Sequence, residues 1–138
     1  MGELKELAAE AKHELLTHII PFWRGMRDDK FGGYYGYLSY DLALNEKAEK
    51  GCILNSRITW FFANAYLLYK DGGISEEECE AAGFKGEDLL AEAKHGYEFL
   101  RDHCIDKEYG GIFWSLNYDG TPLDTTKHTY NQAFCIYA

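Results

Sequence analysis

The amino-acid sequence predicts a mainly helical protein built from an internal repeat, and three observations support this fold class. Apolar residues recur at three- and four-residue intervals over several stretches, which is typical of amphipathic helices. One stretch, residues 54–69, is apolar on nearly every side, so we expect a helix that is buried on all sides in an inner layer. An aromatic segment that contains a glycine pair occurs twice.

The first helix is predicted over residues 4–20. Pro21 has no backbone N–H and clashes with the preceding turn of a helix, so we expect this helix to end or to kink near residues 18–20. Its apolar face is formed by Leu4, Leu7, Ala8, Ala11, Leu15 and Ile19.

Two aromatic segments, residues 29–41 and 106–119, are predicted to form β-hairpins. In each segment a glycine pair permits a tight turn, and strand-prone aromatic residues follow it. Gly32 and Gly110 are 78 residues apart (110 − 32), and so are Tyr40 and Tyr118 (118 − 40). One offset without gaps relates the two segments, which indicates an internal repeat.

Three further helices complete the pattern. Ser75 and Glu78 form a capping box, which predicts a short helix over residues 75–82. Amphipathic spacing predicts a helix over residues 88–104, and residues 128–138 are again apolar and helical. Each repeat therefore consists of an outer helix, an aromatic hairpin and an inner helix, a unit that must stack on its neighbours. Because the second copy stops inside an apolar helix without a cap, we expect a truncated chain.

The charge and composition of the chain limit the classes of partner and the cellular compartment that we expect. The formal net charge of −9 argues against nucleic acid or an anionic membrane as a partner. Acidic residues in the first turns are unlike a signal peptide, and no apolar run approaches the roughly 20 residues that span a bilayer. The four cysteines form no CxxC pair and no histidine pair has metal-ligand spacing, so we expect buried thiols, no metal and a cytoplasmic protein.

Five ordered blocks resemble the cellobiose 2-epimerase branch of the N-acylglucosamine 2-epimerase family. The blocks are residues 18–23, 32–40, 51–57, 109–111 and 127–134. The resemblance implies an (α/α)6 barrel with aromatic β-hairpins at its mouth, of which residues 1–138 would be the truncated N-terminal part of a single catalytic domain. The connection over residues 71–87 is longer than the family pattern, and we expect it on the outer surface.

Arg57 is the leading candidate for a catalytic residue. It is the only charged residue between Lys50 and Lys70, and it lies at the start of the most apolar predicted helix. A buried guanidinium cannot shed its charge, so it needs either a carboxylate partner from another helix or a polar cavity. The resemblance places this arginine in the sugar site.

The resemblance implies epimerisation at C2 of a reducing-end aldose. Removal of the C2 proton beside the open-chain aldehyde develops negative charge on the carbonyl oxygen, which Arg57 would stabilise. The family uses two later histidines as base and acid, and none of the five histidines present replaces them convincingly. We therefore expect the 138 residues alone to be inactive and poorly soluble. Proton transfer beside a carbonyl requires no cofactor.

Tyr130, Trp60 and His128 are the candidate substrate-binding residues. Tyr130 matches a substrate-contacting tyrosine of the family and offers both a ring and a hydroxyl; the alternative is a core tyrosine. Trp60 lies three residues after Arg57, where a core position is the stronger interpretation. His128 precedes the last helix, and it would either line the site or cap that helix.

The expected ligand is a small-molecule sugar, either cellobiose or a related disaccharide. Three alternatives remain open. A mannose-type aldose–ketose isomerase or an N-acetylglucosamine 2-epimerase would share the barrel. An (α/α)6 glycoside hydrolase would need paired carboxylates, for which only Asp124 is suggestive. A helical repeat scaffold for protein binding would need polar inner faces, which residues 54–69 lack.

Overall fold

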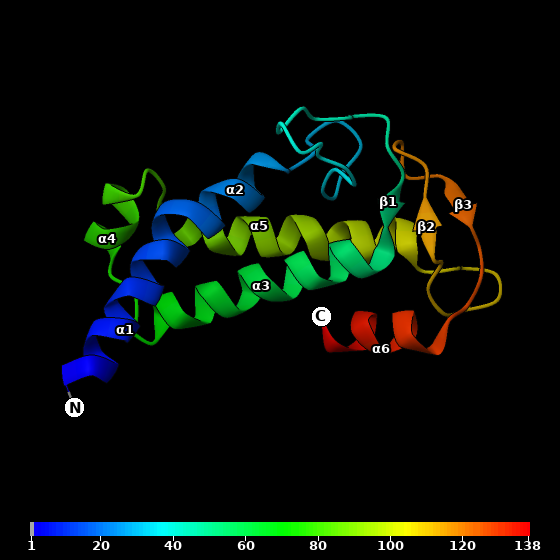
Figure 1. Ribbon diagram of the computed structural model, residues 1–138. Helices are drawn as coiled ribbons and strands as arrows, with labels where there is room; N and C mark the ends of the chain where they lie inside the picture. The colour runs from blue at the N-terminus through cyan, green and yellow to red at the C-terminus, as the bar shows by residue number, and fades with distance from the viewer. Residues whose placement is uncertain (1) are drawn as a thin grey trace.

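The computed structural model describes residues 2–138 as a mainly helical chain with a small antiparallel sheet at one end (Figure 1). The long helices α3 and α5 lie side by side, and α6 packs against α3. No helix in residues 2–138 is long and apolar enough to cross a membrane. The elements in order are α1 (Gly2–Glu14), the π-helix η1 (Leu15–Ile19), α2 (Ile20–Gly25), β1 (Lys50–Gly51), α3 (Cys52–Lys70), α4 (Glu76–Ala81), α5 (Gly86–Phe99), the π-helix η2 (Leu100–Cys104), β2 (Ser115–Leu116), β3 (Pro122–Asp124) and α6 (Thr129–Tyr137).

The predicted helices are present, with starts of α3 and α5 two residues earlier than predicted, and the first helix is interrupted before Pro21 rather than ended there. The helical path does not end at Pro21, which lies in the first turn of α2. The preceding turn is π-helical, and the amide of Ile20 donates to the carbonyl of Leu15. The wider turn accommodates a residue without an N–H, since a π-helix shifts the hydrogen-bond pattern by one residue. The short helix α4 begins at the predicted capping box of Ser75 and Glu78.

The two aromatic segments form hairpins that are shorter than predicted. Each glycine turn is closed by a single antiparallel bridge, Arg27 with Tyr34 and Ile105 with Ile112. Within residues 29–41 the structure has only single bridges, such as the bridge of Leu38 with Leu44. The second segment contributes β2, which pairs with β1 on one side and with β3 on the other. The glycine pairs have positive φ angles at both residues, a conformation that glycine adopts without steric cost in a tight turn between antiparallel segments.

The first glycine turn is anchored to the start of α3. Asp28 Oδ1 accepts hydrogen bonds from the amides of Lys30 and Phe31, at 2.9 and 3.0 Å. Lys50, the second residue before α3, donates from Nζ to Asp28 Oδ2 at 2.6 Å and to the Gly32 carbonyl at 2.7 Å. We call this arrangement the first Lys–Asp anchor.

The second glycine turn repeats this arrangement at the start of α6. Asp106 Oδ1 accepts from the amides of Glu108 and Tyr109 at 2.9 and 3.1 Å. Lys127, the second residue before α6, donates to Asp106 Oδ2 at 2.6 Å and to the Gly110 carbonyl at 2.7 Å. This second Lys–Asp anchor confirms the internal repeat, because the two aspartates are again 78 residues apart (106 − 28).

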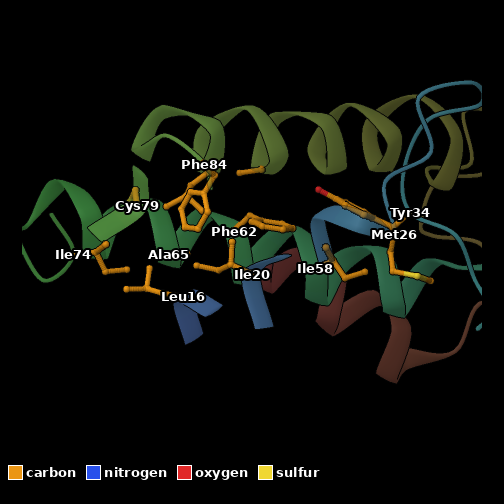
Figure 2. Packing of buried hydrophobic residues seen from close by; sticks show 12 residues of the cluster. Leu16, Ile20, Met26, Tyr34, Ile58, Phe62, Ala65, Ile74, Cys79 and Phe84 are labelled. Atoms are coloured by element: carbon orange, nitrogen blue, oxygen red, sulfur yellow. The ribbon is translucent and has the colours of Figure 1, made fainter. Parts of the chain in front are cut away.

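The hydrophobic core lies mainly between α2, α3, α4 and α5 (Figure 2). Phe62 and Leu89 are fully buried there, and Phe62 stacks on the ring of Tyr34 at 5.9 Å. A smaller cluster around Cys52, Phe99 and Leu116 lies under the sheet. The expectation that α3 is buried on all sides was wrong for residues 2–138, because the face that carries Arg57, Trp60 and Leu67 is exposed.

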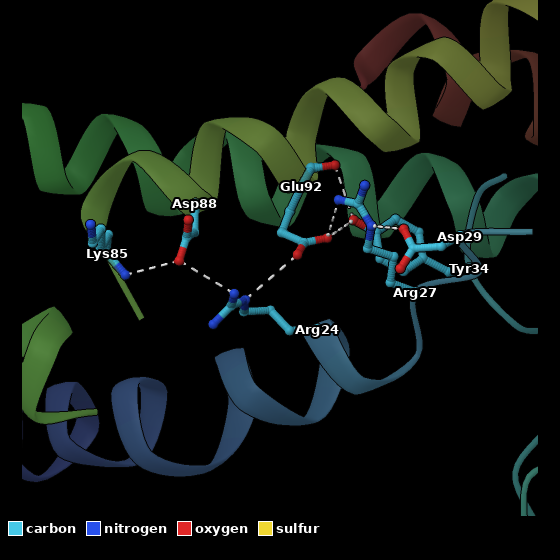
Figure 3. A network of polar contacts seen from close by, with 7 residues as sticks. All are labelled: Arg24, Arg27, Asp29, Tyr34, Lys85, Asp88 and Glu92. Atoms are coloured by element: carbon cyan, nitrogen blue, oxygen red, sulfur yellow. Dashed lines mark hydrogen bonds and ion pairs between the residues drawn. The ribbon is translucent and has the colours of Figure 1, made fainter. Parts of the chain in front are cut away.

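A polar network joins α2 to α5 (Figure 3). Arg24 and Arg27 form ion pairs with the buried carboxylate of Glu92, at 3.5 and 3.3 Å. The hydroxyl of Tyr34 also donates to Glu92, at 3.1 Å. Burial, together with the nearby Glu92 charge, raises the pKa of Tyr34 far above its usual range. This network holds α2 and the turn that follows it against α5.

Candidate functional site

A hollow of about 740 Å³ lies where α2, α3 and α6 approach one another. Its walls are apolar and largely aromatic, and Arg57 is the only charged residue among them. Apolar pockets with few well-placed polar groups are the usual form of a small-molecule site. The lining residues are Trp23, Ile53, Leu54, Arg57, Ile58, Trp60, Phe61, Phe134 and Tyr137.

Arg57 extends from the second turn of α3, because the helix begins at Cys52, two residues earlier than predicted. Its side chain is exposed rather than buried, so that part of the prediction was wrong for residues 2–138. Within residues 2–138 it forms no ion pair with a carboxylate, whereas Arg24, Arg27 and Arg101 each do. Its guanidinium carbon instead lies 5.8 Å from the centre of the Phe134 ring.

Tyr130 lies in the first turn of α6 with 59% of its surface exposed, so it is not a core tyrosine within residues 2–138. Its ring contacts the ring of Phe134 edge-on, with centres 4.8 Å apart and an interplanar angle of 70°. Phe134 is thus the residue that connects Tyr130 with Arg57.

Trp60 lines the hollow one turn beyond Arg57 and is 37% exposed. It stacks on Tyr137 with ring centres 5.2 Å apart, which connects α3 with the end of α6. An exposed stacked pair can serve as a ligand surface or as an interface.

His128 lies apart from the hollow, at the N-cap position of α6. It therefore marks the entry to that helix, as one of the two interpretations predicted, although its side chain makes no capping hydrogen bond. The imidazole packs edge-on against Trp114, with ring centres 4.7 Å apart.

Asp124 has the wrong electrostatics for the general acid of a hydrolase. Its Oδ1 accepts hydrogen bonds from the hydroxyl and the amide of Thr126. These hydrogen bonds lower the pKa of Asp124, which favours the ionised form. A general acid needs a raised pKa.

Sequence reasoning missed Phe134 and Trp23 as lining residues. Phe134 is four residues after Tyr130, and this spacing places both on one face of α6. That signal was available in the sequence. The position of Trp23 in the hollow could not be predicted from the sequence, because it depends on the π-helical turn that carries the helix past Pro21.

The hollow combines an aromatic surface with a single cation whose charge is not balanced by a carboxylate in the described part of the chain. Aromatic faces suit the apolar C–H faces of sugar rings, and a guanidinium offers five N–H donors to oxygen atoms. The arrangement can bind a polyhydroxylated ligand and stabilise an oxyanion.

Comparisons with known proteins identify the family. A model described as N-acylglucosamine 2-epimerase (GlcNAc 2-epimerase) matches residues 33–138. A cellobiose 2-epimerase of Ruminococcus albus is 51% identical over 132 residues, which are 96% of this chain and 30% of that protein. A cellobiose 2-epimerase of Eubacterium cellulosolvens is 53% identical over 125 residues, which are 91% of this chain and 27% of that protein.

A solved structure agrees with these sequence relatives. The structure of cellobiose 2-epimerase from Bacillus thermoamylovorans B4167 matches with a TM-score of 0.83 at 38% identity, covering 96% of this chain and 30% of that one. The chain therefore spans about 30% of the length of the relatives that it matches.

Proposed function

Because the chain belongs to the N-acylglucosamine 2-epimerase family, we propose that the protein is a sugar 2-epimerase that inverts C2 of a reducing-end aldose. The observation that supports this most directly is Arg57, a guanidinium without a carboxylate partner in residues 2–138, in an aromatic hollow. The substrate that we propose is cellobiose or a related disaccharide, since the relatives at 51% and 53% identity are named cellobiose 2-epimerases.

The proposed reaction proceeds through an enediolate. A base removes the C2 proton of the open-chain aldose, and the electron pair moves to the carbonyl oxygen at C1. Arg57 donates hydrogen bonds to that oxygen and thereby stabilises the charge that develops in the transition state. An acid on the opposite face returns a proton to C2, which inverts its configuration. No electrons are exchanged with a second reactant, so the reaction requires no cofactor.

The proton-transfer groups that we propose are two histidines outside residues 1–138. The proposed whole is an (α/α)6 barrel, of which residues 1–138 form the N-terminal part of one catalytic domain, in the cytoplasm. Tyr130 and Trp60 would contact the sugar, Tyr130 from the start of α6 and Trp60 from the wall of the hollow. His128 would act indirectly, because its ring lies against Trp114.

Incubation of the full-length protein with cellobiose in D2O tests the activity. We expect the C2 epimer, in which the glucose at the reducing end has become mannose, with deuterium at C2 detected by NMR. Release of free glucose without the epimer would instead indicate a hydrolase. Accumulation of the 2-ketose would indicate an aldose–ketose isomerase.

The variant Arg57→Ala tests the role of the guanidinium. Loss of one preorganised oxyanion donor lowers kcat by roughly 100- to 1,000-fold in other enzymes, and we expect a loss in that range. Arg101→Ala is the matched control. Arg101 lies in η2, forms an ion pair with Asp102 and does not line the hollow. Full activity of Arg57→Ala would contradict the proposed role. The 138 residues produced alone are expected to show no exchange at C2.

A further inference from the structure

Phe134 is the contact that holds two candidate site residues from different helices together. It extends from α6, and its ring lies beneath the guanidinium of Arg57 on α3, at 5.8 Å from the guanidinium carbon. The same ring contacts Tyr130, one turn earlier on α6, with ring centres 4.8 Å apart. Arg57 and Tyr130 are 73 residues apart in the sequence (130 − 57), and Phe134 contacts both of them, while the stack of Trp60 on Tyr137 joins the same two helices further along.

The kind of support matters for the chemistry. Arg24, Arg27 and Arg101 are held by carboxylates at 2.5–3.5 Å, which occupy N–H donors and offset the positive charge. An aromatic face attracts a cation through its quadrupole and accepts no conventional N–H hydrogen bond in the guanidinium plane. Arg57 therefore keeps its donors and its full charge available to a ligand in the hollow.

An arginine side chain on an open surface samples many rotamers, because four torsions separate the guanidinium from the backbone. Catalytic groups lose large factors in rate when they are displaced by about 1 Å. A flat ring beneath the guanidinium limits this freedom without neutralising the charge. Phe134 is half-buried and lines the hollow, so its ring is part of the wall that a ligand would meet.

We propose that Phe134 is a positioning residue for the proposed epimerase reaction, which orients Arg57 toward the carbonyl oxygen and fixes Tyr130 relative to it. This inference rests on the proposed function, since it concerns the orientation of Arg57, the residue proposed to stabilise the negative charge on the carbonyl oxygen. It differs from a packing role because the aromatic face, and not only the apolar volume, is required.

Two substitutions in the full-length protein separate these roles. Phe134→Leu keeps most of the apolar volume but removes the ring, whereas Phe134→Tyr keeps the ring. We expect Phe134→Leu to lower kcat for C2 exchange about 10-fold, corresponding to about 1.4 kcal/mol, with a smaller change in KM. Phe134→Tyr should stay within about 3-fold of the wild type.

The outer surface supplies a matched control. Arg101 lies over the ring of Tyr97 on α5, also at 5.8 Å, outside the hollow. Tyr97→Leu therefore removes the same type of contact and should leave kcat unchanged. Wild-type kcat in Phe134→Leu, or an equal loss in Phe134→Leu and Phe134→Tyr, would overturn the proposal.

A spectroscopic measurement does not depend on activity. The Nε–Hε NMR signal of Arg57, assigned by its absence in Arg57→Ala, should be displaced by the ring current of Phe134. The displacement should vanish in Phe134→Leu and persist in Phe134→Tyr and Tyr97→Leu. An unchanged signal in Phe134→Leu would refute the positioning contact itself. If the wild-type protein showed the displacement but no exchange at C2, the proposed reaction would fail and the contact would stand.

Discussion

Gly33 occupies a position that no side chain fits. Its φ of +66° lies in the left-handed region, and a Cβ atom there would lie 2.6 Å from both Asn55 Oδ1 and Phe99 Cδ1. The same Asn55 oxygen accepts the amide of Tyr34 at 2.9 Å, so it cannot move away without losing this hydrogen bond. Backbone conformation and close packing therefore both require glycine.

The variant Gly33→Ala should lower the free energy of unfolding by about 3 kcal/mol, from strain in φ and from overpacking. Gly110→Ala is the control, because Gly110 has a φ of +74° but no atom within 4 Å of its Cβ position. It should cost about 1 kcal/mol, which is the conformational cost alone. Urea denaturation monitored by circular dichroism measures both. Equal losses would show that the clash is relieved by relaxation.

The two Lys–Asp anchors hold equivalent elements in different environments. The side chains of Lys50 and Asp28 are 0% and 1% exposed, whereas those of Lys127 and Asp106 are 32% and 10% exposed. Removing one member of a buried pair leaves the other charge without compensation, while a partly solvated pair is screened by water. Loss of the lysine should therefore lower the free energy of unfolding more at the first anchor than at the second, although the two anchors have the same geometry.

Lys50→Met should lower the free energy of unfolding by about 3–5 kcal/mol, because Asp28 would remain buried without its cation. Lys127→Met keeps a comparable side-chain volume and should cost much less. Chemical denaturation of both variants gives the comparison. A larger loss for Lys127→Met would contradict the assignment of the first anchor as the buried one.

The second anchor also makes stability depend on pH. The hydrogen bond from Lys127 and the amides of Tyr109 and Glu108 lower the pKa of Asp106 in the folded protein. This stabilisation is complete above the unfolded pKa of about 3.9 and is lost as the pH falls through the folded pKa. In Lys127→Met the free energy of unfolding should fall less than in the wild type when the pH is lowered below about 4. Unfolding curves at several pH values would detect this difference.

At the scale of the whole molecule, α3 separates two environments. One side contributes Phe62 and Ala65 to the core shared with α5, and the other carries Arg57 and Trp60 toward the hollow. The core side is closed by the network around Glu92, so the position of Arg57 depends on the packing behind it. Stability and site geometry are therefore coupled through one helix.

Phe62→Ala should lower the free energy of unfolding by about 3–5 kcal/mol, since it removes a fully buried ring and leaves a cavity. Phe62→Leu retains part of the volume and should cost roughly 1 kcal/mol. Thermal unfolding of the two variants ranks them. Similar midpoints for both would mean that the surrounding helices collapse into the space.

The sequence predicted the helices and the repeat because both depend on local periodicity and on glycine pairs. It did not predict that Arg57 lies on an exposed face, since the partner of a helix face depends on which helices pack against it. It predicted an end or a kink before Pro21 but not the π-helical turn over Leu15–Ile19 that carries the helix past the proline. The block of residues 127–134 contains Phe134 but does not reveal its contact with Arg57, because that contact joins two helices.

The Lys–Asp anchors have a consequence for how the chain folds. Each anchor joins residues that are only 22 or 21 positions apart, so closing it costs little chain entropy compared with contacts between distant repeats. Contacts of low sequence separation form early in proteins rich in local interactions. We therefore expect each glycine turn to close against the start of α3 or α6 early in folding, before the two repeats pack against each other.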